Sequence, residues 1–189
     1  MDCCQSQSNN CACNTGCCGG ENISQVEENK KIIIDFLYLD LDICTRCQGT
    51  EEGLDEAIED VAEVLQLTGA EVVVNKIHIE NKEMAIQHKF ISSPTIRVNG
   101  KDIQMEVKES LCESCGDLCG DDVDCRVWIY KGKEYNAPPK AMIIDVILRE
   151  VYGDNNRPSD YNNNREIYQL PENLKRFFEA INKNKNINA

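Results

Sequence analysis

Residues 31–50 read KIIIDFLYLDLDICTRCQGT, a dense apolar run that leads into two closely spaced cysteines. The run from Ile32 to Leu39 predicts a strand that is buried on both faces, as in a parallel or mixed sheet. Cys44 and Cys47 follow with two residues between them, a spacing at which two thiols can close a disulfide or bind one soft metal ion. The stretch therefore predicts a buried strand that ends beside a pair of thiols.

A helix is expected directly after this pair. Thr50 is a predicted N-cap, Gly69 is a predicted stop, and apolar side chains recur between them at steps of three and four: Leu54, Ala57, Ile58, Val61, Ala62 and Leu65. The unpaired amides and positive dipole end of such a helix stabilise a thiolate. A C-x-x-C motif within a β-α-β pattern is typical of thioredoxin-like redox proteins.

The composition limits the classes of function. The chain has 189 residues, 41% of them hydrophobic, and its net charge of −13 disfavours nucleic acids and anionic membranes as partners. No stretch is long enough to span a membrane, and the start lacks the features of a signal peptide, so we expect a cytoplasmic protein. Because thiols stay reduced there, the twelve cysteines indicate metal binding or redox chemistry.

Half of the cysteines lie in the first 30 residues: Cys3, Cys4, Cys11, Cys13, Cys17 and Cys18. We expect this segment to be a disordered tail, because its other residues are mostly polar or glycine. Its Cys-Cys and Cys-x-Cys pairs resemble the clusters of metallothioneins, and soft sulfur favours Cu(I), Zn(II), Cd(II), Hg(II) or trivalent arsenic. The alternatives are a leader without a fixed ligand and direct pairing with the dithiol of Cys44 and Cys47.

The middle of the chain continues the alternation of strands and helices. A strand is predicted from Ala70 to Glu80, and a short helix from Lys82 to His88. Ser93-Pro94-Thr95 comes next, followed by a hairpin with the turn Asn99-Gly100. This order resembles thioredoxins and glutaredoxins, which carry a cis-proline in such a Pro-Thr context, facing their C-x-x-C.

The resemblance implies an α/β, thioredoxin-like fold for residues 31–152, with helices flanking a central mixed sheet. It also implies a cis peptide bond before Pro94. The backbone of Ser93 would then be free to pair with an extended substrate, which makes Ser93 and Thr95 the expected substrate-binding residues.

Residues 106–126 depart from that pattern as a cysteine-rich insertion with C-x2-C-x3-C-x5-C spacing: Cys112, Cys115, Cys119 and Cys125. Four thiols at such distances can surround one metal, and a zinc ion or an iron–sulfur cluster is the leading interpretation. Disulfide pairs and a thiol relay to the active site are the alternatives.

The last elements complete the expected domain. Residues 127–135 predict a hairpin, and Pro138-Pro139 opens a helix from Lys140 to Tyr152. Residues 153–189 are expected to hold an Asn-rich linker and a short amphipathic helix from Leu170 to Asn184. Its apolar face either packs back on the domain or docks a partner.

Four motifs, DICTRCQGT, SSPT, ESLCESCG and PPKAMII, extend the resemblance over most of the domain. Together they resemble an uncharacterised thioredoxin-like family of prokaryotes, known as a domain of unknown function. Thr45-Arg46 replaces the Gly-Pro of thioredoxin itself, and the cysteine insertion is extra. The resemblance therefore implies the fold more than the activity.

Two functions follow from these patterns. In the first, the protein is a thiol–disulfide oxidoreductase acting on a protein or small-molecule partner. Cys44, expected to be the more exposed thiol, attacks, Cys47 resolves the mixed disulfide, and Pro94 shapes the docking groove. Arg46 stabilises the thiolate, recognises an anionic substrate, or is merely solvated. In the second, the clusters bind or transfer a soft metal or metalloid such as Zn, Cu, Hg or As.

Overall fold

The computed structural model describes residues 30–120, 122–153 and 168–187. Its main sheet has the order β2-β1-β3-β4. Strand β1 (Lys30–Tyr38) runs parallel to β2 (Ala70–His78) and antiparallel to β3 (Thr95–Val98), which pairs with the short β4 (Lys101–Asp102). The prediction of an α/β fold with a mixed sheet flanked by helices is confirmed. The N-terminal tail and the Asn-rich linker lie outside the described residues.

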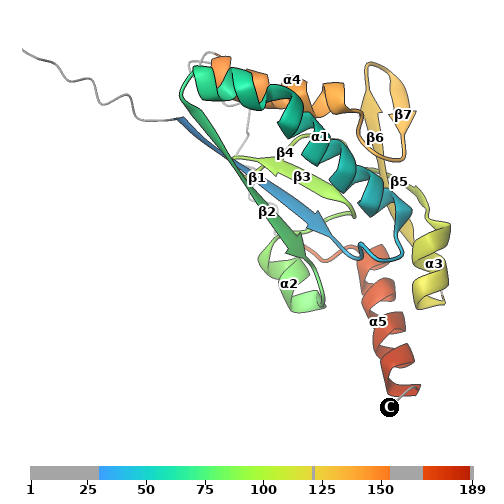
Figure 1. The fold of residues 1–189 in the computed structure, drawn as a ribbon. Coiled ribbons are helices and arrows are strands. Elements are labelled where there is room, and N and C mark those ends of the chain that lie inside the picture. The colour runs from blue at the N-terminus through green and yellow to red at the C-terminus, as the bar shows by residue number, and fades with distance from the viewer. Residues whose placement is uncertain (1–29, 121, 154–167, 188–189) are drawn as a thin grey trace, which may run out of the picture.

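Helices cover both faces of this sheet (Figure 1). Helices α1 (Thr45–Leu67) and α4 (Lys140–Tyr152) share one apolar core with alternate residues of β1: Ile32, Ile34 and Phe36. The next residues in the opposite phase, Leu37 and Leu39, belong to a second core with α2 (Lys82–Gln87), α3 (Glu113–Cys119) and α5 (Glu172–Ile187). Six buried cysteines lie in this second core, so it is the core that positions the site.

Strand β1 is buried on both faces only toward its C-terminal end, in contrast to the sequence prediction. Phe36 and Leu37 are fully buried, whereas Ile33 keeps 40% of its surface exposed. The second core includes Leu37 and the residues after it but does not extend back to Ile33. The doubly covered end is the one that leads into Cys44.

Helix α1 begins at Thr45, six residues before the start that a Thr50 cap predicts. The Cys44 thiol replaces the expected Thr50 cap, because its Sγ accepts a hydrogen bond from the backbone N–H of Cys47 at 3.4 Å. Thr50 lies inside the helix, where its hydroxyl donates to the Arg46 carbonyl at 2.7 Å. The predicted stop is confirmed, since the helix ends at Leu67 and Gly69 takes the left-handed conformation.

A second sheet is formed by the two ends of the cysteine insertion and the hairpin that follows it. Strands β5 (Lys108–Leu111), β6 (Asp124–Tyr130) and β7 (Lys133–Tyr135) pair in that order, all antiparallel. Helix α3 connects β5 to β6, and its presence was not predicted from the sequence. The predicted hairpin of residues 127–135 is confirmed as β6 and β7, with Lys131 and Gly132 at the positive φ angles that a tight hairpin turn requires.

The C-terminal helix α5 packs on α3, as the prediction of a face that packs back on the domain requires. Leu174, Phe177 and Phe178 are buried in the core that holds the cysteines. Asn173 ties the helix to β6, because its side chain accepts from the Asp124 N–H at 3.1 Å and donates to the Asp124 carbonyl at 2.6 Å. In the described part of the chain no helix is long and apolar enough to cross a membrane.

Strand β6 is fastened to the main sheet by a buried ion pair. The guanidinium of Arg126 is fully buried and donates to both carboxylate oxygens of Asp102 at 2.8 Å. The same guanidinium lies 5.1 Å from the ring centroid of Trp128. The pair therefore fixes the strand that carries Cys125 against the end of the β3–β4 hairpin.

Replacing Asp102 by alanine should lower the free energy of unfolding by about 3–5 kcal/mol, because the Arg126 charge is then buried without a partner. Urea unfolding followed by the fluorescence of Trp128 measures the change. Asp55→Ala, which removes an exposed partner of Lys76, is the matched control and should cost about 1 kcal/mol or less. Similar losses in the two variants would contradict this role of the buried pair.

Candidate metal centre

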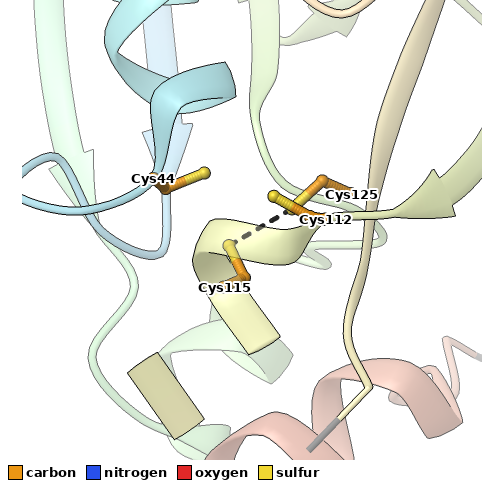
Figure 2. Close-up of side chains that lie close together, drawn as sticks. All are labelled: Cys44, Cys112, Cys115 and Cys125. Carbon is orange, nitrogen blue, oxygen red and sulfur yellow. Dashed lines mark hydrogen bonds between the residues drawn. The ribbon is translucent and has the colours of Figure 1, made fainter. Parts of the chain in front are cut away.

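Four buried cysteines from the start of α1, the start of α3 and strand β6 meet in one place: Cys44, Cys112, Cys115 and Cys125. Their sulfur atoms all lie within 4.8 Å of one another, and the Sγ atoms of Cys115 and Cys125 are 3.3 Å apart. Figure 2 shows the side chains directed toward a shared space. Such a group can hold a metal ion.

Local structure explains how the insertion contributes three of these thiols. Cys112 is the N-cap of α3, where its N–H donates to the Val123 carbonyl at 2.8 Å, and Cys115 lies in the first turn. Gly120 ends the helix in the left-handed conformation, which turns the chain back toward Cys125 in β6. Both thiols of the Cys112–Cys115 pair therefore face the start of α1.

Cys119, the fourth cysteine of the predicted cluster, lies outside this group. It comes one helical turn after Cys115, and its Sγ is 4.0 Å from the Gly116 carbonyl oxygen. Its own carbonyl accepts a hydrogen bond from Asn184 of α5 at 3.0 Å. The structure thus brings Cys112, Cys115 and Cys125 together as expected and completes the group with Cys44. The six cysteines before residue 30 lie outside the described residues.

Arg46, between the two cysteines of the motif, holds the insertion against α1. Its Nη1 donates to the carbonyls of Cys125 at 2.9 Å, Ser110 at 3.3 Å and Arg126 at 3.4 Å. Its Nη2 donates to the Leu111 carbonyl at 2.8 Å and to the Ser110 hydroxyl at 3.0 Å. The role of this arginine is therefore to fasten β5 and β6 beside the thiols, which none of the sequence interpretations anticipated.

Cys47 points toward the proline loop and is not a member of the group of four. Its Sγ lies 3.4 Å from the hydroxyl oxygen of Ser93. The peptide bond between Ser93 and Pro94 is cis, as predicted. The dithiol and the proline loop are therefore adjacent, as the resemblance to thioredoxins implies.

The surroundings of this loop and the exposure of Cys44 differ from the sequence prediction. The Ser93 carbonyl accepts the backbone N–H of Arg126 at 2.7 Å, so strand β6 occupies the edge expected to bind an extended substrate. Ser93 and Thr95 are each only 1% exposed. Cys44 is also no more exposed than Cys47, since both are fully buried. The insertion therefore covers this edge of the proline loop.

The thiols are packed so closely that the pKa values of some are lowered and those of others are raised. Hydrogen bonds with Cys112, Cys115 and Cys125 hold the pKa of Cys44 far below its usual range. Hydrogen bonds with Cys115 and Cys125 lower the pKa of Cys112 to about 6.

The pKa values of three other thiols are raised. The hydrogen bond with Cys44 raises the pKa of Cys47, and burial adds to the effect. Contact with Cys112 raises the pKa of both Cys115 and Cys125. Thiolates that are buried this close together repel one another. Some of these thiols are therefore ionised while their neighbours stay protonated.

The group reaches the surface at Cys112. This residue, 3% exposed, lines two hollows of about 750 and 480 Å³. Glu113 and Asp117 line both hollows. Each hollow therefore brings two carboxylates and the Cys112 thiol to the same lining.

The fold and the site together define an α/β protein with a mixed sheet and a buried four-cysteine group able to hold a metal ion. Comparison with protein families matches residues 32–147 to a domain of unknown function, DUF2703, and the chain belongs to this family. The comparisons with curated proteins and with solved structures gave no match.

Arg46→Ala should open the insertion and expose its thiols, because all the hydrogen bonds described for the guanidinium go to β5 and β6. In reduced, metal-free protein, alkylation of Cys115 and Cys125 should become about tenfold faster or more, which corresponds to roughly 1.4 kcal/mol. Timed labelling with peptide mass analysis provides the measurement. Arg97→Ala is the matched control, since Arg97 binds carbonyls of His88 and Lys89 instead. Equal acceleration in both variants would argue against a local role for Arg46.

Proposed function

We propose that the protein binds one thiophilic metal ion of the zinc class through Cys44, Cys112, Cys115 and Cys125. The observation that carries the proposal is the mutual approach of four buried sulfurs within 4.8 Å. Zinc–sulfur bonds of about 2.3 Å in a tetrahedron place the sulfurs about 3.8 Å apart, which falls within this spacing. Tetrahedral sulfur sets favour zinc or iron.

The spacing favours a single ion over an iron–sulfur cluster. A cluster contains several metal atoms and bridging sulfides, which force its cysteine ligands farther apart than ligands of one shared ion. The closest pair here is separated by only 3.3 Å. The donor chemistry agrees, because a bound cation deprotonates all four thiols and removes the repulsion that otherwise keeps some of them protonated.

The proposed role is to hold the ion and pass it to another thiol ligand, since Cys112 is positioned for ligand exchange. It lines the two hollows with Glu113 and Asp117, while Cys44, Cys115 and Cys125 are fully buried. An incoming thiol would therefore displace Cys112 first. The cysteines of the N-terminal tail are the suggested first capture site, as the sequence indicates.

We also propose a thioredoxin-like origin for the domain. The order of strand, C-x-x-C, helix, strand, helix, cis-proline and hairpin supports it. The parallel pairing of β1 with β2 and the antiparallel pairing of β1 with β3 fit the same scheme. In this view, the insertion has converted an exposed dithiol site into a closed ligand set.

Anaerobically purified, reduced protein should bind Co²⁺ with the intense absorption of a tetrahedral thiolate site, and zinc should displace it. To isolate the described cysteines, all variants carry serine in place of the six N-terminal cysteines. Replacing Cys44, Cys112, Cys115 or Cys125 by serine should weaken binding by about 100-fold or more, since changes even in outer-shell residues cost 10–100-fold. Cys119→Ser, on the same helix as Cys115, should bind normally. Unchanged binding in Cys44→Ser would refute the proposed ligand set.

Thiol–disulfide exchange is the second candidate, favoured by the position of Cys47 beside the cis-proline loop. Cys44 would attack a disulfide substrate and Cys47 would resolve the product. Because strand β6 covers the loop, this activity requires the insertion to move away.

A Cys47→Ser variant tests the second candidate, because the mixed disulfide on Cys44 then cannot be resolved. Incubation with a small disulfide should leave an adduct of the substrate thiol on Cys44, detected by peptide mass analysis. A variant with Cys44→Ser as well should carry none on that peptide. If Cys44 stays unmodified while the tail is serine-substituted and the metal is removed, the exchange mechanism fails.

A further inference from the structure

Cys44 is placed for two kinds of bond that exclude each other, a bond to a metal ion and a disulfide. It supplies one of the four sulfurs of the candidate metal centre. It is also the N-cap of the helix turn that contains Cys47, whose N–H reaches the Cys44 Sγ at 3.4 Å. A sulfur that has become half of a disulfide is no longer a thiolate ligand. Bonding between Cys44 and Cys47 therefore excludes Cys44 from the metal set.

Resting on the proposed metal binding, we infer that the site is redox-controlled: oxidation of Cys44 with Cys47 to a disulfide releases the bound ion. Cys47 is suited to this role because it lies outside the group of four and follows the Cys44 cap in the first turn of α1. Its thiol contacts Ser93 on one side and Cys44 on the other. The ion therefore loses one ligand while the other three stay in place.

The oxidant is proposed to be a peroxide, which is small enough to enter a site whose thiols are almost fully buried. The Cys44 thiolate attacks one peroxide oxygen, the O–O bond breaks, and hydroxide leaves, which gives a sulfenic acid on Cys44. The Cys47 sulfur then displaces water from this sulfenic acid as the S–S bond forms. The two sulfurs give up two electrons in total, and these reduce the peroxide. A dithiol reductant reverses the disulfide and restores the ligand set.

The nearest competing reaction is between Cys115 and Cys125, whose sulfurs are 3.3 Å apart. That reaction would remove two ligands at once and would not involve Cys47. Cys44 and Cys47 occupy the cap and the first turn of one helix, as Cys112 and Cys115 do in α3, whereas a bond between Cys115 and Cys125 would join a helix to a strand. The two routes are therefore separable by a substitution at Cys47.

The test uses the full-length chain with the six tail cysteines replaced by serine, loaded with zinc and treated with one equivalent of hydrogen peroxide. A chromophoric chelator follows zinc release. Trypsin cuts after Arg46, so peptides containing Cys44 and Cys47 stay joined only when the disulfide has formed. We expect stoichiometric release, joined peptides, and recovery of zinc binding after treatment with a dithiol. In Cys47→Ser, release should be about tenfold slower or more.

The controls separate this inference from the proposed function. Cys119→Ser removes a buried thiol outside both sets and should release zinc like the parent protein. Reduced Cys47→Ser should hold as much zinc as the parent, which shows that it folds. Equal release rates in Cys47→Ser and the parent, or a linkage of Cys115 to Cys125 as the main product, would overturn the inference while leaving zinc binding intact. A reduced parent that binds no zinc would instead refute the proposed function.

Discussion

The contact between the Arg46 guanidinium and the carbonyl oxygens of β5 and β6 is the interaction on which the cysteine arrangement depends. It joins the motif that carries Cys44 to the strand that carries Cys125. The acceptors are backbone carbonyls and the Ser110 hydroxyl, so this attachment uses none of the thiols. Arg46 thus fixes the position of Cys125 relative to Cys44, a cysteine of the same C-x-x-C motif.

The same attachment explains why the site is closed. Once β6 lies beside α1, its Arg126 N–H reaches the Ser93 carbonyl, and the ion pair with Asp102 anchors the strand from the far side. A groove that binds an extended chain needs this edge to be free, whereas a pocket that encloses an ion needs it to be covered. Here the edge is satisfied internally, which favours ligand enclosure over substrate docking.

Much of the fold was predictable because buried strands, tight turns and helix starts each require particular residue types, which can be recognised in the sequence. The turn at Asn99-Gly100 and the Pro138-Pro139 start of α4 were confirmed. The apolar run before Cys44 forms the predicted strand, although it is buried on both faces only toward its C-terminal end. The predicted start of α1 was wrong. Threonine is a preferred N-cap residue, which pointed to Thr50, but the Cys44 thiol caps the helix instead.

The composition of the four-cysteine group could not be obtained from spacing. Cys119 continues the pattern of the insertion, but helical periodicity moves it one turn away from its neighbours. Cys44 is 68 residues before Cys112 in the sequence and joins the group only through the docking of β6. The sequence around Arg46 and Ser110 does not predict the hydrogen bonds between them, because these depend on how two distant segments pack.

Helix α5 comes after every cysteine in the order of the chain, yet it helps to hold the insertion in place. Asn173 bonds to both backbone groups of Asp124, and Asn184 bonds to the Cys119 carbonyl. During synthesis, the ribosome therefore releases all twelve sulfurs before the last supporting helix has emerged. A nascent chain would pass through a period in which its buried thiols are made but not yet enclosed by α5.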